Sequence, residues 1–195
     1  MAQLNWDQGF DLDFDLNTGY SSGAETTKRY LSQMRGMFYD DRAYERCLDQ
    51  GDPLVYEFYE LGCPERPGDL AFGTTVLYPG TVGDEFYMTK GHFHTRLMTG
   101  EVYYTLRGEG RMLLENSEGD QRLLPLVPGR AVYVPRGYAH RTVNTGSEPL
   151  VVFFTFDADA GHDYGTIETK GYRQLVVKGP EGVRAVPNPK WSGHD

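Results

Sequence analysis

From Pro53 onward the chain is a series of short segments that are rich in aromatic and β-branched residues. Gly, Pro, Asn or Asp separates each segment from the next, which is the pattern of strands joined by turns. The predicted strand segments cover residues 53–61, 72–80, 85–94, 101–108, 110–116, 122–127, 130–135, 139–144, 150–156 and 172–179. Because no helical pattern alternates with these strands, the order argues against a parallel α/β sheet and favours an all-β sandwich or barrel.

Two helices are predicted before the strands begin. Residues 24–38 have apolar side chains at helical spacing, and residues 41–49 form a second such face. The apolar positions are Tyr30, Leu31, Met34 and Phe38 in the first, and Tyr44, Cys47 and Leu48 in the second. A Gly-Asp-Pro sequence ends the second helix. We therefore expect an N-terminal extension with two short helices (residues 1–52) and a barrel (residues 53–195) within one structural domain.

The overall charge and the cysteines limit the classes of protein. A formal net charge of −9 argues against nucleic acid, because phosphate backbones attract basic surfaces. No stretch approaches the roughly 20 apolar residues that cross a bilayer, and the N-terminus lacks the pattern of a signal peptide. Cys47 and Cys63 do not have the spacing of a metal site. These features favour a reduced cytoplasmic protein with no membrane partner, while a local cation still allows a small anionic substrate.

Two histidines stand one residue apart in the sequence GHFHTRLMTGE, and a glutamate follows them. In a strand, His92 and His94 point to the same face, because side chains alternate with a period of two. A loop then leads to Glu101, which opens the next strand and comes to lie beside the two imidazoles if the strands are antiparallel. Two nitrogens and a carboxylate oxygen suit Zn, Fe, Mn or Ni better than Ca or Mg. His140, in the segment YVPRGYAHRTVN, is the candidate fourth ligand.

These residues resemble the two sequence motifs of the cupin superfamily. His92, His94, Glu101 and Gly108 follow the first motif, although six residues separate His94 from Glu101 and Phe86 stands where the motif has glycine. The second motif is matched at every fixed position, which are Gly129, Pro135, Gly137, His140 and Asn144. The resemblance implies a cupin double-stranded β-helix, which is a jelly-roll barrel, around a metal site.

A closer resemblance extends over most of residues 53–191. The stretches TKGHFHTRLMTGEVYYTLRGEGRMLLE and AGHDYGTI, with TTVLYPG before them and NPKW near the end, are similar to the cupin-type glucose-6-phosphate isomerases. This resemblance implies interconversion of glucose 6-phosphate and fructose 6-phosphate, a phosphosugar as the substrate, and a homodimer. It also implies one divalent metal per chain. Iron as Fe(II) is the family's metal, and the ligand types also suit Mn(II), Zn(II) or Ni(II).

The resemblance also implies roles for individual residues. Glu101 is the candidate base, although a metal ligand is a poorer base, and a direct hydride shift from C2 to C1 is the alternative. His162 and Tyr164 are candidates for opening the sugar ring, because both can exchange protons. The remaining candidates line the substrate site. Tyr56 and Tyr103 are expected to contact sugar hydroxyls, and Thr75, Thr89 and Gly91 are expected to hold the phosphate.

One position departs from the family, and two other functions remain open. Phe156 stands where the family has a tyrosine that contacts the phosphate, which predicts a missing hydrogen bond. A metal-dependent cupin oxygenase or decarboxylase would share the four metal ligands but would not explain the AGHDYG segment. A non-catalytic sugar-binding cupin is the third interpretation. His194 lies in the C-terminal tail and is interpreted as a solvated surface residue.

Overall fold

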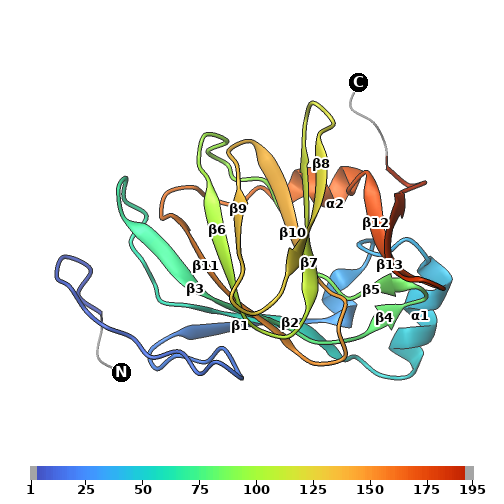
Figure 1. Ribbon diagram of the computed structural model, residues 1–195, viewed down its shortest axis with the longest axis horizontal. Helices are drawn as coiled ribbons and strands as arrows, with labels where there is room; N and C mark the ends of the chain where they lie inside the picture. The colour runs from blue at the N-terminus through green and yellow to red at the C-terminus, as the bar shows by residue number, and fades with distance from the viewer. Residues whose placement is uncertain (1–3, 192–195) are drawn as a thin grey trace.

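The structure is a computed structural model that describes residues 4–191. Its strands form three antiparallel sheets (Figure 1). The largest contains, in spatial order, β1 (Glu25–Tyr30), β2 (Leu54–Glu60), β3 (Leu70–Leu77), β11 (Leu150–Asp157), β6 (Glu101–Arg107) and β9 (Ala131–Val134). The second contains β10 (Tyr138–Asn144), β7 (Gly110–Asn116) and β8 (Gln121–Leu126). The third contains β13 (Gly182–Pro187), β12 (Gln174–Gly179), β5 (Glu85–Phe86) and β4 (Thr81–Val82). His194 lies outside the described residues.

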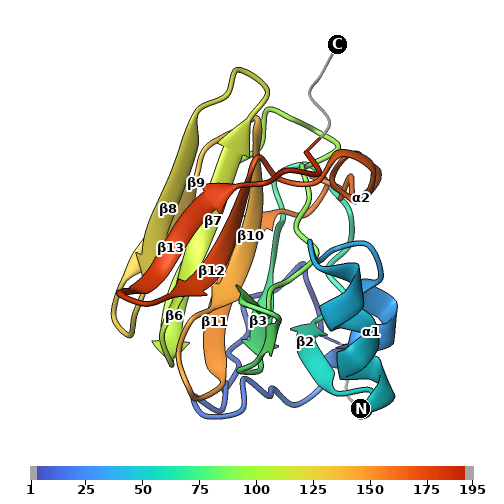
Figure 2. The same cartoon turned by 90° about the vertical axis from the view of Figure 1, so that its right-hand side faces the viewer.

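The six-stranded and three-stranded sheets form two walls of a barrel. Figure 2 shows β7 and β8 towards one side of the molecule and β2 and β3 towards the other. A single pocket takes its lining from both sheets, with side chains from β2, β3, β6 and β11 on one wall and from β10 on the other. The fold is therefore the predicted all-β cupin barrel, and its pocket lies between the sheets.

The N-terminal segment differs from the sequence prediction. A helix over residues 24–38 is wrong, because residues 25–30 form β1 and pair with β2 along its whole length. Exposure in β1 alternates along the chain, as expected for a strand with one covered face. Only one turn of 3-10 helix follows (η1, Leu31–Met34), and its two buried side chains account for the apolar spacing. Residues 25–30 form backbone hydrogen bonds with the edge of β2. These bonds outweigh the helical spacing of the apolar residues in the segment.

The two α-helices flank the barrel rather than enter it. The helix α1 (Asp41–Asp49) has the predicted bounds, and Asp40 caps its first turn by accepting a hydrogen bond from the Ala43 amide at 2.9 Å. The helix α2 (Gly165–Lys170) directly follows the AGHDY sequence. Because β1 pairs with β2, the segments on either side of residue 52 share one sheet. The division at residue 52 stays a prediction.

The segment 85–94 is also less regular than predicted. Strand pairing is continuous only over β5, and isolated bridges then join Met88 to Val143, His92 to His140 and Phe93 to Asp163. Gly91 has φ +74°, a conformation outside the β region, and it interrupts the strand. A β-carbon at this position would lie 2.5 Å from the Tyr172 hydroxyl, so both space and conformation require glycine.

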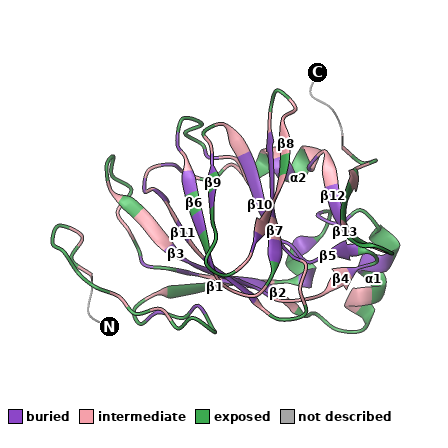
Figure 3. Ribbon diagram, in the orientation of Figure 1, coloured by how far each residue is buried: buried purple, intermediate pink, exposed green. Residues whose placement is uncertain are grey.

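Buried residues are spread along the strands of the barrel (Figure 3). The largest fully buried side chains come from the N-terminal segment as well as from the barrel. They include Leu31, Met34, Phe38, Leu77, Met88, Met112 and Tyr172. Residues 31–38 therefore help to close the core of the barrel. No helix within residues 4–191 has the length and apolar character to cross a bilayer.

Candidate active site

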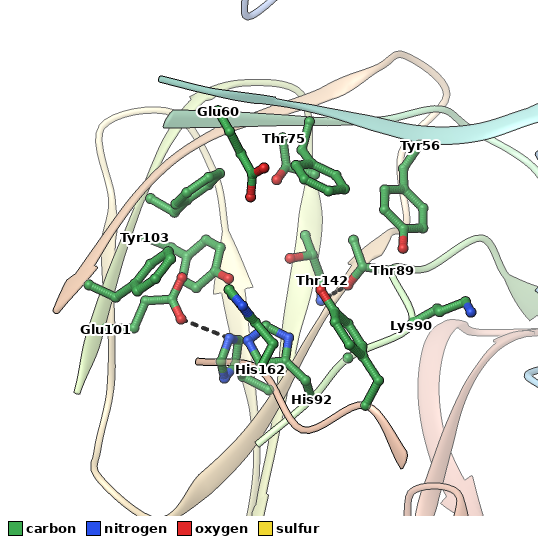
Figure 4. Close-up of a pocket in the computed structure, with 16 residues that line it drawn as sticks. Tyr56, Glu60, Thr75, Thr89, Lys90, His92, Glu101, Tyr103, Thr142 and His162 are labelled. Atoms are coloured by element: carbon green, nitrogen blue, oxygen red, sulfur yellow. Dashed lines mark hydrogen bonds and ion pairs between the residues drawn. The ribbon is translucent and has the colours of Figure 1, made fainter. Parts of the chain in front are cut away.

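Four predicted ligand residues come together at the base of the pocket. His92, His94, Glu101 and His140 each offer one donor atom, and these atoms all lie within 4.8 Å of one another. The irregular segment after β5 supplies the first two residues, β6 begins with Glu101, and β10 supplies His140. His92 and His140 are held opposite each other by a pair of backbone hydrogen bonds of 3.3 and 3.1 Å. Figure 4 shows His92 and Glu101 pointing into the same space.

The contacts of Glu101 and Thr99 show which ring nitrogen of His94 carries the proton. Glu101 Oε2 lies 2.8 Å from His140 Nε2 and 3.1 Å from His94 Nε2. On its other side, His94 Nδ1 lies 2.8 Å from Thr99 Oγ1, whose proton is donated to the Arg96 carbonyl at 2.7 Å. The hydroxyl must therefore accept a hydrogen bond from Nδ1–H. When the His94 imidazole is neutral, the lone pair of its Nε2 therefore faces the Glu101 carboxylate. These two electron-rich groups repel each other, and a cation between them would remove the repulsion.

Burial and neighbouring charges shift the pKa values of residues in the cluster. Burial lowers the pKa of His92 well below its ordinary value, and neighbouring imidazoles lower it further. Burial alone would raise the pKa of Glu101, but the charge of His140 and the nearby imidazole nitrogens outweigh it and lower that pKa. His92 Nε2 is buried and has no hydrogen-bond partner among the described residues. The orphaned nitrogen, the lone pair of His94 and the ionised carboxylate together fit a divalent cation.

A pocket lies above the cluster. It encloses about 560 Å³ when the solvent at its mouth is included, and it is lined by aromatic side chains and a few polar groups. The lining residues are Tyr56, Phe58, Glu60, Thr75, Thr89, Lys90, Gly91, His92, Glu101, Tyr103, His140, Thr142, Phe154, Phe156, His162 and Tyr164. All the substrate-binding and ring-opening candidates from the sequence are therefore on this surface.

His162 and Tyr164 form one side of the pocket next to the cluster. Their rings are stacked, with centroids 5.8 Å apart, and the His162 ring lies 4.5 Å from that of His92. The backbone of Asp163 between them pairs with Phe93, which fixes both side chains relative to the histidine pair. Burial lowers the pKa of His162 and raises that of Tyr164 to about 12. Both residues are therefore neutral near pH 7.

The candidate substrate contacts lie at two levels of the pocket. Tyr103 is buried close to Glu101, and burial and the carboxylate charge raise its pKa well above the ordinary value. Thr75, Thr89 and Tyr56 lie farther from the cluster, and the Thr89 hydroxyl accepts a hydrogen bond from the Thr142 amide at 3.1 Å. Figure 4 shows Tyr56 close to Thr89 and Lys90, on the opposite wall from Tyr103.

Among the residues of the site, Thr99 and Glu60 were missed by sequence reasoning, whereas Phe156 was singled out as a departure from the family. Thr99 lies in the loop before β6, and nothing in its sequence neighbourhood marks it as a partner of His94. Glu60 falls in period two with Tyr56, which could have indicated the same face. Phe156 packs against His94 and His162, with ring centroids 5.8 and 5.3 Å away. Phe156 in β11 pairs with Glu101 in β6, whereas Thr75 in β3 pairs with Val152, four residues away along β11. Phe156 therefore lies at the level of the cluster.

An antiparallel barrel with three imidazoles and a carboxylate inside it is the arrangement of a cupin with a metal-type site. Residues 28–191 match the family described as glucose-6-phosphate isomerase (GPI). The chain therefore belongs to the glucose-6-phosphate isomerase family and is an enzyme. The match favours isomerisation over the two alternatives, an oxygenase or decarboxylase and a non-catalytic sugar-binding cupin.

Relatives named glucose-6-phosphate isomerase span nearly the whole chain. The glucose-6-phosphate isomerase of Thermococcus gammatolerans is 50% identical over 97% of this chain and 100% of its own. That of Pyrococcus furiosus is 49% identical over 93% of this chain and 96% of its own. Among solved structures, a mutant of Bacillus subtilis oxalate decarboxylase aligns with 55% of this chain and 27% of its own, at 25% identity and a TM-score of 0.44.

Proposed function

We propose that the protein interconverts glucose 6-phosphate and fructose 6-phosphate with one divalent metal ion per chain. His92, His94, Glu101 and His140 would hold the ion, and iron as Fe(II) is the metal that the family resemblance implies. The observation that supports this most directly is the convergence of the four donor atoms within 4.8 Å at the base of the pocket. The names of the relatives support the substrate pair.

The reaction exchanges the positions of a carbonyl and a hydroxyl group at C1 and C2 of the sugar. When bound, the metal would supply a Lewis acid that stabilises negative charge developing on the substrate oxygens. The protein contributes a closed environment, since Glu101 and His140 are almost completely buried. Tyr103, which stays protonated near neutral pH, can donate a hydrogen bond to a sugar oxygen at this level of the pocket.

Proton transfer between C2 and C1 is assigned to Glu101, with a hydride shift as the alternative. Glu101 Oε2 contacts two imidazoles, and its low pKa weakens it as a base in this arrangement. The proton route therefore requires the carboxylate to turn from an imidazole towards C2. Turnover in deuterated water tests the assignment, because the proton route introduces solvent deuterium at carbon. A product without deuterium would contradict the role of Glu101 as base.

Ring opening is assigned to His162 and Tyr164. The reaction takes a proton from the C1 hydroxyl and delivers one to the ring oxygen. The neutral imidazole can accept the first, and the Tyr164 hydroxyl can donate the second. Their stacked arrangement beside His92 supports this assignment, because it places both groups next to the carbon atoms that react.

The phosphate is assigned to the other end of the pocket, where Thr75, Thr89 and Gly91 offer hydroxyl and amide donors. In the six-stranded sheet Thr75 pairs with Val152, four residues along β11 from Phe156, which pairs with Glu101. At about 3.4 Å per residue this separates the two levels by about 13 Å. An open-chain hexose phosphate held between them would keep its phosphate away from the carboxylate of Glu101.

The homodimer and the cytoplasmic location are also proposals. Val102, Tyr104 and Tyr133 are exposed on the outer face of β6 and β9, where they form an apolar patch beside a free sheet edge. A second copy of the chain would cover this patch. Light scattering of the wild type and of Tyr133→Glu tests the dimer. Cys47 and Cys63, which are free thiols, support a reducing compartment.

The experiment for the proposed function is a coupled assay on fructose 6-phosphate after chelation and refilling. We expect the chelated protein to lose activity and Fe(II) to restore it, with Mn(II), Zn(II) and Ni(II) as comparisons. Oxygen uptake is measured in the same samples and is expected to be absent. Full activity after the complete removal of metal would contradict the proposal.

A further inference from the structure

The strand that the sequence did not predict carries a cation next to the pocket. In the antiparallel pair of β1 and β2, Arg29 stands directly opposite Tyr56. Directly opposed residues have their side chains on the same face of a sheet. Tyr56, Phe58 and Glu60 on that face of β2 line the pocket, so β1 extends the pocket wall by one strand. Arg29 is half-covered, while its neighbours Lys28 and Tyr30 are exposed.

The guanidinium group is close enough to influence the pocket. It lies 5.9 Å from the centroid of the Phe58 ring, which lines the wall next to Tyr56. Burial raises the pKa of Tyr56, and the Arg29 charge is the largest effect that opposes this. The same charge acts against the raised pKa values of Glu60 and Tyr164, which are due first to burial. Three residues of the pocket therefore sense Arg29.

The other cations near this end are already engaged. Lys90 forms an ion pair with Glu168 at 2.8 Å. Arg141 is buried, and its Nη2 and Nε donate to the Lys90 carbonyl at 2.6 and 3.2 Å. Within residues 4–191, by contrast, Arg29 has no ion-pair partner, and its Nη1 donates to the Lys28 carbonyl at 3.1 Å. Because a guanidinium group carries five N–H donors, Arg29 retains donors for a ligand.

The distribution of charge along the wall favours one orientation of an anion. Glu60 stands at the far end of β2 from Tyr56, and Figure 4 shows it well separated from Tyr56 and Thr89. An anion is repelled from the Glu60 end and attracted to the Arg29 end. The Arg29 end also contains the Thr89 hydroxyl and the amide of Gly91, where a backbone group can approach an oxyanion.

We propose that Arg29 binds the phosphate group of the sugar substrate, which makes β1 a functional wall of the active site. This inference rests on the proposed isomerase function and adds a specific cation to it. Arginine suits the role, because its planar group can donate two parallel hydrogen bonds to phosphate oxygens. The chain thus places a phosphate-binding residue in its N-terminal segment, before the barrel strands that hold the reacting end.

The test compares Arg29→Gln, Arg29→Lys and Lys28→Gln. Lys28 is the matched control, because it is the neighbouring residue on the opposite face of β1 and its loss changes the net charge equally. For Arg29→Gln we expect the KM for fructose 6-phosphate to rise about 10- to 100-fold with kcat within about twofold. Arg29→Lys should recover part of the loss. Calorimetry with inorganic phosphate gives a second readout that does not depend on turnover.

The outcomes separate this inference from the proposed function. An unchanged KM in Arg29→Gln, or an equal rise in Lys28→Gln, would overturn the role of Arg29 while leaving the isomerase intact. A wild type without isomerase activity would overturn the proposed function, and phosphate calorimetry would then decide on Arg29 by itself. Weaker phosphate binding in Arg29→Gln alone supports the assignment, and equal binding in all variants contradicts it.

Discussion

The two ends of the pocket are built in different ways. The cluster end consists of buried side chains from β6, β10 and the segment between β5 and β6, with donor atoms held by backbone pairing. The proposed phosphate end is lined by side chains of β2, whose edge partner is β1, and by a loop that contains Gly91. In the proposed function, the chemistry that needs fixed geometry lies where packing is tight, and the charged group of the substrate is recognised at the other end of the pocket.

The two regions also treat buried carboxyl groups in opposite ways. At the cluster end, the imidazoles outweigh burial and lower the pKa of Glu101. Behind the phosphate end, burial dominates at Glu85 and raises its pKa to about 7, although the Tyr39 amide and the charge of Arg141 oppose the shift. The ionised carboxylate of Glu101 is ready to bind a cation, while the carboxyl group of Glu85 is half-protonated near neutral pH.

Substitution of His140 is expected to have the largest effect, and it tests the cluster end. Replacing it by alanine removes one of four donors, so metal content and activity should fall together, with activity lost by about a thousandfold. His162→Ala is the matched variant, since it should lose activity while retaining metal. Elemental analysis and the coupled assay check both. A His140→Ala protein with full metal content would contradict the assignment.

Changing the pH is expected to change the free energy of unfolding through Glu85. The pKa of Glu85 is about 7 in the folded protein, above the ordinary value of 4.5. Its contribution to stability is complete below about pH 4.5 and is lost as the pH rises through 7. The difference corresponds to about 3 kcal/mol of unfolding free energy.

Denaturant unfolding at pH 5 and pH 8 measures this contribution. The wild type should lose about 2.5 kcal/mol more than Glu85→Gln between the two values. Asp84→Asn is the control, because its side chain is exposed and adjacent in sequence. Equal losses in the wild type and Glu85→Gln would show that Glu85 does not titrate in this range.

Gly91→Ala tests how far the phosphate end depends on its backbone. The new β-carbon would meet the Tyr172 hydroxyl at 2.5 Å, in addition to the strain of φ +74°. Gly119→Ala carries a similar strain, with φ +95°, but nothing lies within 4 Å of its β-carbon. Gly91→Ala should therefore be less stable than Gly119→Ala by about 1–3 kcal/mol and should also raise KM. Equal stability of the two variants would mean that the space around Gly91 is not limiting.

Thr99→Val is expected to have the smallest effect and refines the account of the cluster end. Loss of the hydroxyl that orients His94 should weaken metal binding by about 10- to 100-fold without removing a ligand. Thr99→Ser keeps the hydroxyl and should bind metal like the wild type. Competition with a chelator of known affinity measures the difference, and equal affinities of Thr99→Val and the wild type would count against this role.

The sequence predicted the cluster better than the wall opposite it, and the reason is physical. His92, His94 and Glu101 are close in sequence, and His140 lies in a recognisable motif, so short-range patterns were enough to group them. The role of β1 depends on pairing with the edge of β2, a tertiary interaction that overrides local helical spacing. Thr99 belongs to the site only through contacts that form on folding, and no local pattern distinguishes it.

The most direct test of the central claim is anomalous X-ray diffraction at the iron edge from crystals of the Fe(II)-loaded, active protein. We expect one iron peak per chain at the base of the pocket. A nitrogen of each of His92, His94 and His140 and an oxygen of Glu101 should bind this iron. An active crystal with no peak at that position, or with iron bound by other residues, would contradict the account.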